Sequence, residues 1–172
     1  MNIAELLKEV KYSGSFEDKA VLGVTDNSRA VRAGSVFVCI KGAHFDGHSV
    51  AKEAENDGAV LIVAEHDTGA KNQVLVEDSR SAYSLICAAF YGWPAKHLTL
   101  IGVTGTNGKT TTTMLLKGIL DKAGIRCGLV GTVQNMVGEK ALPASLTTPD
   151  CKDLQKLFAD MVEAGCTHCI ME

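Results

Sequence analysis

Two glycines, one lysine and several hydroxyl side chains follow directly after an apolar run at residues 98–103. Glycines let backbone N–H groups approach phosphate oxygens without a Cβ in the way, and the N-terminus of a following helix adds partial positive charge. A lysine here reaches the β- and γ-phosphates of a nucleotide, and a hydroxyl binds Mg²⁺. The sequence therefore predicts a nucleotide-phosphate loop formed by Thr104, Gly105, Thr106, Asn107, Gly108, Lys109 and Thr110.

This loop departs from the strict P-loop pattern at one position. The pattern places a further glycine five residues before Gly108, where this chain has Val103. The Gly-Lys-Thr run and its place between a strand and a helix agree with the pattern. The alternative is a glycine-rich connection with an exposed lysine. A dinucleotide site is disfavoured, because no G-x-G-x-x-G run follows either leading strand.

The elements that must position this loop alternate between strand and helix. Strands are predicted at residues 20–24, 35–40, 59–64, 73–77, 98–103, 126–130 and 167–171. Helices are predicted at residues 48–57, 79–92, 109–123 and 151–164. The helix at 109–123 is expected to bury one apolar side made of Leu115, Leu116, Ile119, Leu120 and Ala123. The alternation predicts an α/β fold with mostly parallel sheets covered by helices.

Two domains are expected, with the boundary after Trp93-Pro94, since proline ends the preceding helix. The predicted domains are residues 1–97 and 98–172. The composition is that of an ordinary globular protein, with 46% hydrophobic and 22% charged residues and a net charge of −3. The weak acidity argues against a broad nucleic-acid surface, and no apolar run reaches the length of a membrane span. The N-terminus lacks the pattern of a signal peptide, so we expect a cytoplasmic protein.

Six cysteines are scattered along the chain, and most lie in apolar segments, as expected of buried thiols. Cys166 and Cys169 match the C-x-x-C spacing of a zinc site. That alternative is disfavoured because a structural zinc site needs a second ligand pair, and no convincing pair is present.

The phosphate loop, read as Thr-Gly-Thr-Asn-Gly-Lys-Thr-Thr-Thr, resembles the ATP loop of the Mur ligase and folylpolyglutamate synthetase superfamily, which lacks the first glycine of the strict pattern. Residues 26–42, followed by Phe45-Asp-Gly-His48, resemble the N-terminal domain of Mur ligases of the MurE and MurF types. The resemblance implies that Ser28 contacts a uridine nucleotide. Asn27 stands where the family usually has aspartate. The alternative is that residues 26–28 only form a turn.

The segment Leu146-Thr-Thr-Pro-Asp150 resembles the Thr-Thr-Pro segment of MurE ligases, which implies that Thr147 and Thr148 bind the muramoyl-peptide substrate. By itself it is a β-branched entry to the next helix, with Asp150 as the N-cap. Glu172 follows the last predicted strand, and the resemblance implies that it serves Mg²⁺ together with Thr110.

The resemblance thus implies an α/β uridine-nucleotide domain followed by the beginning of a mostly parallel P-loop ATPase domain. The implied enzyme uses ATP and Mg²⁺ to add meso-diaminopimelate or L-lysine to UDP-N-acetylmuramoyl-L-alanyl-D-glutamate through an acyl phosphate, with Lys109 as the catalytic residue. The sequence leaves the amino acid open. Alternatives are a MurF-type ligase that adds D-Ala-D-Ala, a non-catalytic uridine-nucleotide module and a generic P-loop phosphotransferase. We expect a monomer with no nucleic-acid or membrane partner, and no ligation by the 172-residue chain alone.

Overall fold

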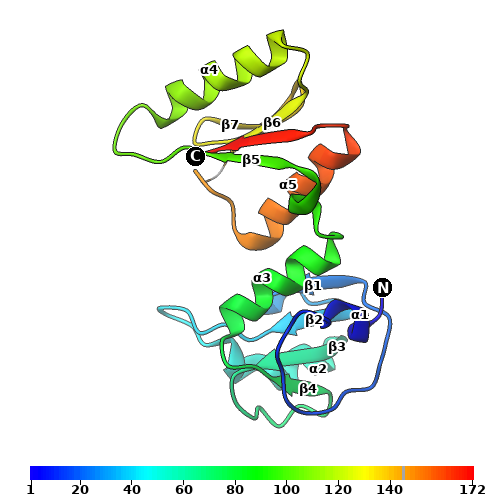
Figure 1. Cartoon of the computed structure of the whole chain (residues 1–172). Helices are drawn as coiled ribbons and strands as arrows, with labels where there is room; N and C mark the ends of the chain where they lie inside the picture. The colour runs from blue at the N-terminus through cyan, green and yellow to red at the C-terminus, as the bar shows by residue number, and fades with distance from the viewer. Residues whose placement is uncertain (145) are drawn as a thin grey trace. The chain divides into compact units, whose positions relative to one another are not determined.

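The computed structural model describes residues 1–144 and 146–172, which separate into two compact units, Met1–Phe90 and Tyr91–Glu172 (Figure 1). In the described part of the chain, no helix is long and apolar enough to cross a membrane. The division falls before residues 91–97, which the sequence pattern assigns to the first domain. These residues join the second unit because the short helix η3 (Pro94–His97) packs against helix α5 (Cys151–Glu163).

The first unit is built on a parallel sheet with the strand order β1-β2-β3-β4. Its strands are β1 (Gly23–Thr25), β2 (Ser35–Val38), β3 (Ala59–Ala64) and β4 (Gln73–Leu75). Each lies within or close to a predicted strand. Strand β2 is buried along its whole length, as expected for a parallel strand covered on both faces.

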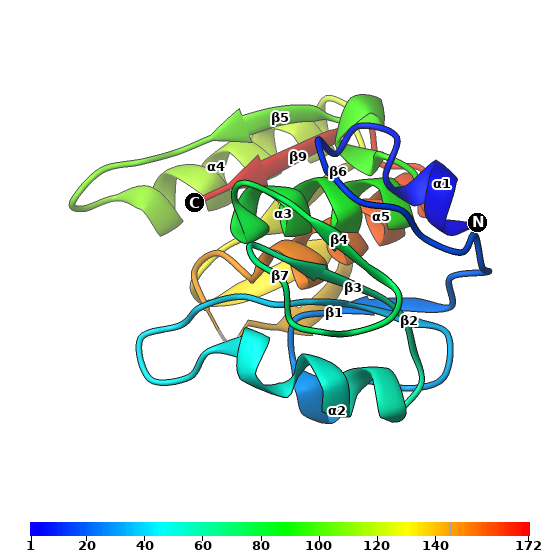
Figure 2. The same cartoon turned by 90° about the horizontal axis from the view of Figure 1, so that it is seen from below.

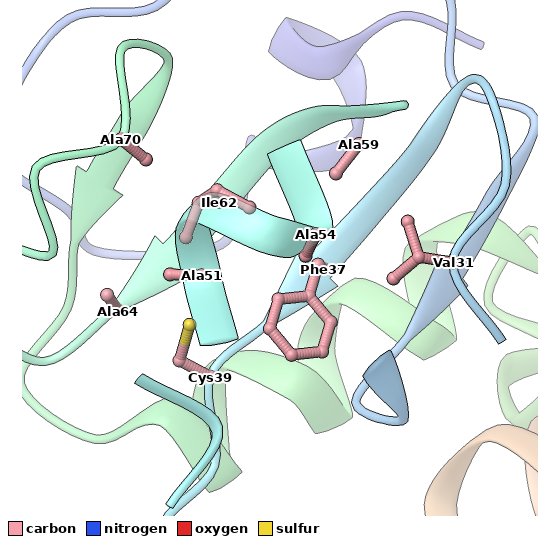
Figure 3. Packing of buried hydrophobic residues seen from close by; sticks show 9 residues of the cluster. All are labelled: Val31, Phe37, Cys39, Ala51, Ala54, Ala59, Ile62, Ala64 and Ala70. Atoms are coloured by element: carbon pink, nitrogen blue, oxygen red, sulfur yellow. The ribbon is translucent and has the colours of Figure 1, made fainter. Parts of the chain in front are cut away.

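Helices cover both faces of this sheet, with α2 (Ala51–Asn56) on one face and α3 (Ser79–Phe90) on the other (Figure 2). The α2 face packs Phe37, Ile62 and Ala64 against Ala51 and Ala54, and all five are buried (Figure 3). The neighbouring strand residues point to the opposite face, because successive strand side chains alternate. The short helix α1 (Ile3–Leu6) contacts α3.

Helix α3 begins with a cap from a distant residue. One carboxylate oxygen of Glu65, just after β3, accepts hydrogen bonds from the Ser79 N–H at 2.9 Å and the Ser79 hydroxyl at 2.7 Å. Ser79 is buried. Both hydrogen bonds favour the carboxylate form, so they hold the pKa of Glu65 below its ordinary value. The glutamate thus ties the end of the sheet to the start of the helix.

We expect Glu65→Ala to destabilise the protein by about 1–2 kcal/mol, since it leaves a buried hydroxyl and a helix N–H without their acceptor. Glu65→Gln keeps an oxygen acceptor at the same position and is expected to cost less. Urea denaturation of the two variants and the parent provides the measurement. An alanine variant as stable as the parent would show that the cap contributes nothing.

The second unit has a sheet with the strand order β5-β9-β6-β7-β8. Strands β5 (Thr99–Gly102), β9 (His168–Met171) and β6 (Cys127–Val130) are parallel, as predicted. Strands β7 (Gln134–Val137) and β8 (Lys140–Pro143) form an antiparallel hairpin that the sequence pattern does not reveal. Helix α4 (Lys109–Lys122) lies on one face of this sheet and α5 on the other (Figure 1). The mixed α/β fold class is confirmed.

The apolar side expected for α4 is wrong in part. Leu115 is 64% exposed and Ile119 is 62% exposed, and Ala123 is also exposed. The face that packs on the sheet carries Thr113, Leu116, Lys117 and Leu120, with the i, i+3, i+4, i+7 spacing of a helix stripe. Buried Lys117 is compensated, because its ammonium donates to the Asp121 carboxylate at 3.0 Å and to the Cys127 carbonyl oxygen at 3.2 Å.

Five of the six cysteines are buried and Cys151 is half-buried, in agreement with the expectation of mostly buried thiols. Burial raises the pKa of Cys39 and of Cys169 to about 12, and that of Cys127 to about 11. These three thiols therefore stay protonated near neutral pH and behave as small apolar side chains.

Candidate functional site

The predicted phosphate loop joins the end of β5 to the start of α4. Gly108 is the N-cap of α4, with a φ of +79°, and Gly105 has a φ of +149°. Both values lie in a region that side chains with a Cβ rarely adopt, so the two glycines are required by the backbone path. Residues 104–108 are exposed. The first N–H groups of α4 point out of a helix N-terminus at this loop, which is the usual arrangement for binding phosphate.

The Lys109 side chain folds back over this loop and contacts its backbone. Its ammonium donates a hydrogen bond to the Gly105 carbonyl oxygen at 2.8 Å. An ammonium has three donors, so the same group retains protons for an anion bound in the loop.

The strand order brings Glu172 to the same edge of the sheet. Strand β9 lies between β5 and β6, and all three are parallel, so their carboxyl ends meet at one edge. The Val103 N–H donates to the Met171 carbonyl oxygen at 2.8 Å, and the Glu172 N–H donates to the Val130 carbonyl oxygen at 3.0 Å. Ligands of open α/β sheets bind at this edge.

Hydrogen-bond donors from two loops surround the Glu172 carboxylate. The Thr132 N–H donates to Oε1 at 3.2 Å and the Thr132 hydroxyl to Oε2 at 3.0 Å. The Thr110 hydroxyl, at the start of α4, is near enough to this carboxylate to help lower its pKa. Burial raises the pKa of Glu172, but these hydrogen bonds and the Lys109 charge outweigh it and lower the pKa below its ordinary value. The group is therefore a carboxylate at neutral pH.

The threonine segment reaches the same point. The Thr147 hydroxyl lies 3.0 Å from the Thr132 hydroxyl, and the Thr148 hydroxyl donates to the Glu172 carbonyl oxygen at 3.1 Å. Asp150 caps α5, as expected, by accepting from the Asp153 N–H at 3.0 Å. The structure thus brings together Lys109, Thr110, Thr147, Thr148 and Glu172, which lie far apart in the sequence.

The loop after β6 contributes residues that the sequence pattern did not single out. Thr132 contacts both Glu172 and Thr147. A Cβ on the preceding Gly131 would lie 2.7 Å from Glu172 Oε1, so only glycine lets the carboxylate come this close. The Gly131 N–H donates to Oδ1 of buried Asn135 at 3.2 Å, which fixes the loop. A glycine and a polar residue directly after a strand are the only local signal of this role.

Ser28 lies in the first unit, in the short helix η1 (Ser28–Ala30). A cavity of about 490 Å³ is lined by Asp26, Asn27, Ser28, Arg29 and Phe45. The Asn27 Oδ1 atom caps η1 by accepting from the Arg29 N–H at 3.1 Å. An aspartate accepts the same bond, so asparagine keeps this structural role.

Phe45 also lines this cavity, although the sequence pattern named it only as part of the motif Phe45-Asp-Gly-His48. It is 54% exposed at the wall of this cavity. The following Asp46 and His48 hold its loop: the Asp46 carboxylate lies 2.6 Å from His48 Nδ1, and the Glu65 N–H donates to His48 Nε2 at 3.0 Å. His48 Nε2 is therefore the acceptor, and Nδ1 carries the proton that is donated to Asp46.

Two sequence profiles of one family match the chain. Residues 21–91 match the profile described as "Mur ligase family, catalytic domain". Residues 103–172 match the profile of the Mur ligase middle domain. The first match contains Ser28 and Phe45, and the second begins at the phosphate loop and ends at Glu172.

Curated relatives agree along the whole chain. The UDP-N-acetylmuramoyl-L-alanyl-D-glutamate--2,6-diaminopimelate ligase of Clostridium botulinum is 43% identical over 179 residues, covering 100% of this chain and 37% of the relative. The enzyme of the same name from Geobacillus kaustophilus is 46% identical over 153 residues, covering 88% of this chain and 31% of the relative. The chain thus spans about a third of the length of these relatives.

Solved structures give the same result. A UDP-N-acetylmuramoyl-L-alanyl-D-glutamate--2,6-diaminopimelate ligase matches 99% of this chain and 35% of its own, with a TM-score of 0.78 and 25% identity. The MurF ligase of Thermotoga maritima, solved in complex with ADP, matches 86% of this chain and 30% of its own, with a TM-score of 0.55 and 26% identity. With both profiles matched in sequence order and relatives at about 40% identity, the chain belongs to the Mur ligase family.

Proposed function

We propose that this chain provides the uridine-nucleotide domain and the phosphate-loop part of a MurE-type ligase. The proposed reaction joins 2,6-diaminopimelate to UDP-N-acetylmuramoyl-L-alanyl-D-glutamate and converts ATP to ADP and phosphate. The observation that carries the proposal is the meeting of the phosphate loop, Glu172 and the two threonines at one sheet edge. The names of the relatives support the MurE type and the choice of diaminopimelate.

In this proposal the phosphate loop binds ATP. The backbone N–H groups at the start of α4 donate to phosphate oxygens, and the Lys109 ammonium, held by the Gly105 carbonyl oxygen, uses its remaining protons to bind the β- and γ-phosphates. A fixed positive charge at this point stabilises the negative charge of the transferring phosphoryl group. The D-glutamate carboxylate of the substrate attacks the γ-phosphorus, ADP leaves, and the amine of the incoming amino acid then displaces phosphate from the acyl phosphate.

Thr110 and Glu172 are the residues that would hold Mg²⁺. A hydroxyl and a carboxylate are hard oxygen ligands, and Thr110 is near enough to Glu172 to help lower the pKa of its carboxyl group. No group of three or more His, Cys, Asp or Glu side chains suited to a metal occurs among residues 1–144 and 146–172. That fits Mg²⁺, which commonly takes one or two protein ligands and fills its other positions with phosphate oxygens and water. The ion would neutralise phosphate charge when bound.

Each of the two units offers its own set of groups for the substrate. Thr147 and Thr148 offer hydroxyl groups to the peptide end of the substrate. In the first unit, the cavity beside Ser28 offers a hydroxyl, the Arg29 cation and the exposed Phe45 ring. An aromatic ring stacks on a nucleobase, and a cation pairs with phosphate, so this set suits a uridine diphosphate. The cytoplasmic location and the monomeric state stay predictions.

The test is turnover by the protein at the length its gene encodes. It is incubated with ATP, Mg²⁺, the UDP-muramoyl-dipeptide and either meso-diaminopimelate or L-lysine, and products are identified by mass spectrometry. We expect a UDP-muramoyl-tripeptide with diaminopimelate. Turnover only with the UDP-tripeptide and D-Ala-D-Ala would establish the MurF type instead. Binding of the UDP ligand without any turnover would favour the non-catalytic alternative.

We expect Ser28→Ala to weaken binding of the UDP-muramoyl-dipeptide by up to about tenfold while ATP affinity stays unchanged. One hydrogen bond to a ligand is worth about 0.5–1.5 kcal/mol. Calorimetric titration of both ligands into the variant and the parent provides the measurement. Unchanged affinity for the UDP ligand would reduce Ser28 to a turn residue.

A further inference from the structure

The hydroxyl of Thr132 lies between two groups that the proposed function uses for different ligands. It lies 3.0 Å from Oε2 of Glu172, on the nucleotide and metal side, and 3.0 Å from the hydroxyl of Thr147, on the substrate side. Thr132 is 40 residues from Glu172 and 15 from Thr147 in the sequence. The three residues therefore come into contact only when the chain folds.

The direction of the two hydrogen bonds follows from the number of protons. A hydroxyl has one proton to donate and two lone pairs that accept. A carboxylate only accepts, so the Thr132 proton goes to Glu172. Thr132 must then accept from the Thr147 hydroxyl. The three side chains form a directed chain from Thr147 through Thr132 to Glu172.

Backbone contacts hold this chain of hydrogen bonds in place. The Thr132 N–H donates to Glu172 Oε1, and the preceding Gly131 N–H is held by buried Asn135. On the other side, Thr148 donates to the main chain of Glu172 at 3.1 Å. The threonine segment is thus tied to the Glu172 main chain directly, and to the Glu172 carboxylate through Thr132.

We propose that Thr132 is a positioning residue that couples the nucleotide side of this site to the muramoyl-peptide side. A ligand that fixes the Glu172 carboxylate also fixes Thr132, and through it the rotamer of Thr147. The peptide end of the substrate then meets a hydroxyl that is already oriented, so each ligand raises the affinity for the other. Such coupling is reciprocal by thermodynamic necessity. This inference rests on the proposed function, because it uses the same ligands.

The experiment measures the dissociation constant of UDP-N-acetylmuramoyl-L-alanyl-D-glutamate by calorimetry, with and without saturating Mg·ADP. The ratio of the two constants is the coupling factor. The protein is used at its full encoded length, as the parent and as Thr132→Val and Thr132→Ser. Valine keeps the shape and removes the hydroxyl, whereas serine keeps the hydroxyl.

We expect a coupling factor of about three to ten for the parent and for Thr132→Ser, in line with one hydrogen bond, and a factor near one for Thr132→Val. Thr147→Val breaks the same chain at its other end and should also give a factor near one. Thr132 is exposed, so the variants should fold; thermal denaturation checks this.

Three results would overturn the inference. They are a parent factor of one, a parent-like factor in both valine variants, or an equal loss of coupling in the serine and valine variants at Thr132. The last would mean that Thr132 acts through its shape. The proposed function survives each of these results, since the parent still binds both ligands. A parent that binds neither ligand would overturn the proposed function together with the inference.

Discussion

Replacing Lys109 by alanine in the protein at its full encoded length is expected to slow the proposed ligation by about 10²–10³-fold, the usual cost of removing one preorganised charge contact to a developing negative charge. Lys109 is the cation of the phosphate loop, and its ammonium is already held over the loop by the Gly105 carbonyl oxygen at 2.8 Å. That contact keeps the side chain near the position where phosphate would bind. The loss should fall mainly on kcat, because the charge matters most when the phosphoryl group is in transit.

The fold should survive this substitution. The Lys109 to Gly105 contact is exposed, and exposed contacts of a lysine contribute little to stability. The matched control is Lys122→Ala, which removes an exposed lysine from the last turn of the same helix, far along it from the loop. Steady-state ligation and thermal denaturation of the two variants and the parent are the measurements. Ligation by Lys109→Ala at the rate of Lys122→Ala would remove Lys109 from the mechanism.

The phosphate loop was predictable because its residues are contiguous. Gly105, Gly108, Lys109 and Thr110 form a local pattern between a strand and a helix, and each type has a separate physical reason to be there. The same logic identified the parallel strands, since short apolar runs between helical patterns have few other interpretations. Local sequence patterns were therefore enough to predict the parallel strands and the loop that follows the first of them in the second unit.

Thr132 escaped prediction because nothing local distinguishes it. It follows a strand and a glycine, and its two partners lie 40 and 15 residues away. Thr147, Thr148 and Glu172 were found only through resemblance to a family. These residues come together because β9 lies between β5 and β6. A strand order of this kind cannot be predicted from the sequence of any one segment.

The hairpin β7–β8 and the buried face of α4 were hidden for related reasons. The hairpin strands mix apolar and polar residues, and its turn at Gly138 lacks the Asn-Gly or Asp-Gly signal. In α4 the buried face includes Thr113 and Lys117, whose polar groups are satisfied inside the protein. A prediction from the spacing of apolar residues places Thr113 and Lys117 on the surface, and it places Leu115 and Ile119 on the buried face instead.

In the protein at its full encoded length, Gly131→Ala should impair the proposed ligation by about 10²-fold without unfolding the protein. The added Cβ would lie 2.7 Å from Glu172 Oε1, so the carboxylate must retreat by roughly 0.7 Å to reach 3.4 Å, where ordinary contact begins. A shift of that size in a positioned group can cost on the order of 10²-fold in rate. The carboxylate would also lose its hydrogen bond from the Thr132 N–H.

Stability should change little, because the atom in the way is the end of a side chain and the Gly131 backbone is outside the left-handed region. The control is Gly118→Ala in α4, where an added Cβ meets nothing within 4 Å. That variant should gain about 0.4–1 kcal/mol of stability and ligate normally. The measurements are the ligation rates and the urea denaturation curves of the two variants and the parent. If Gly131→Ala ligates at the control rate, Glu172 has no fixed position to lose, and its place beside the phosphate loop is not required for the reaction.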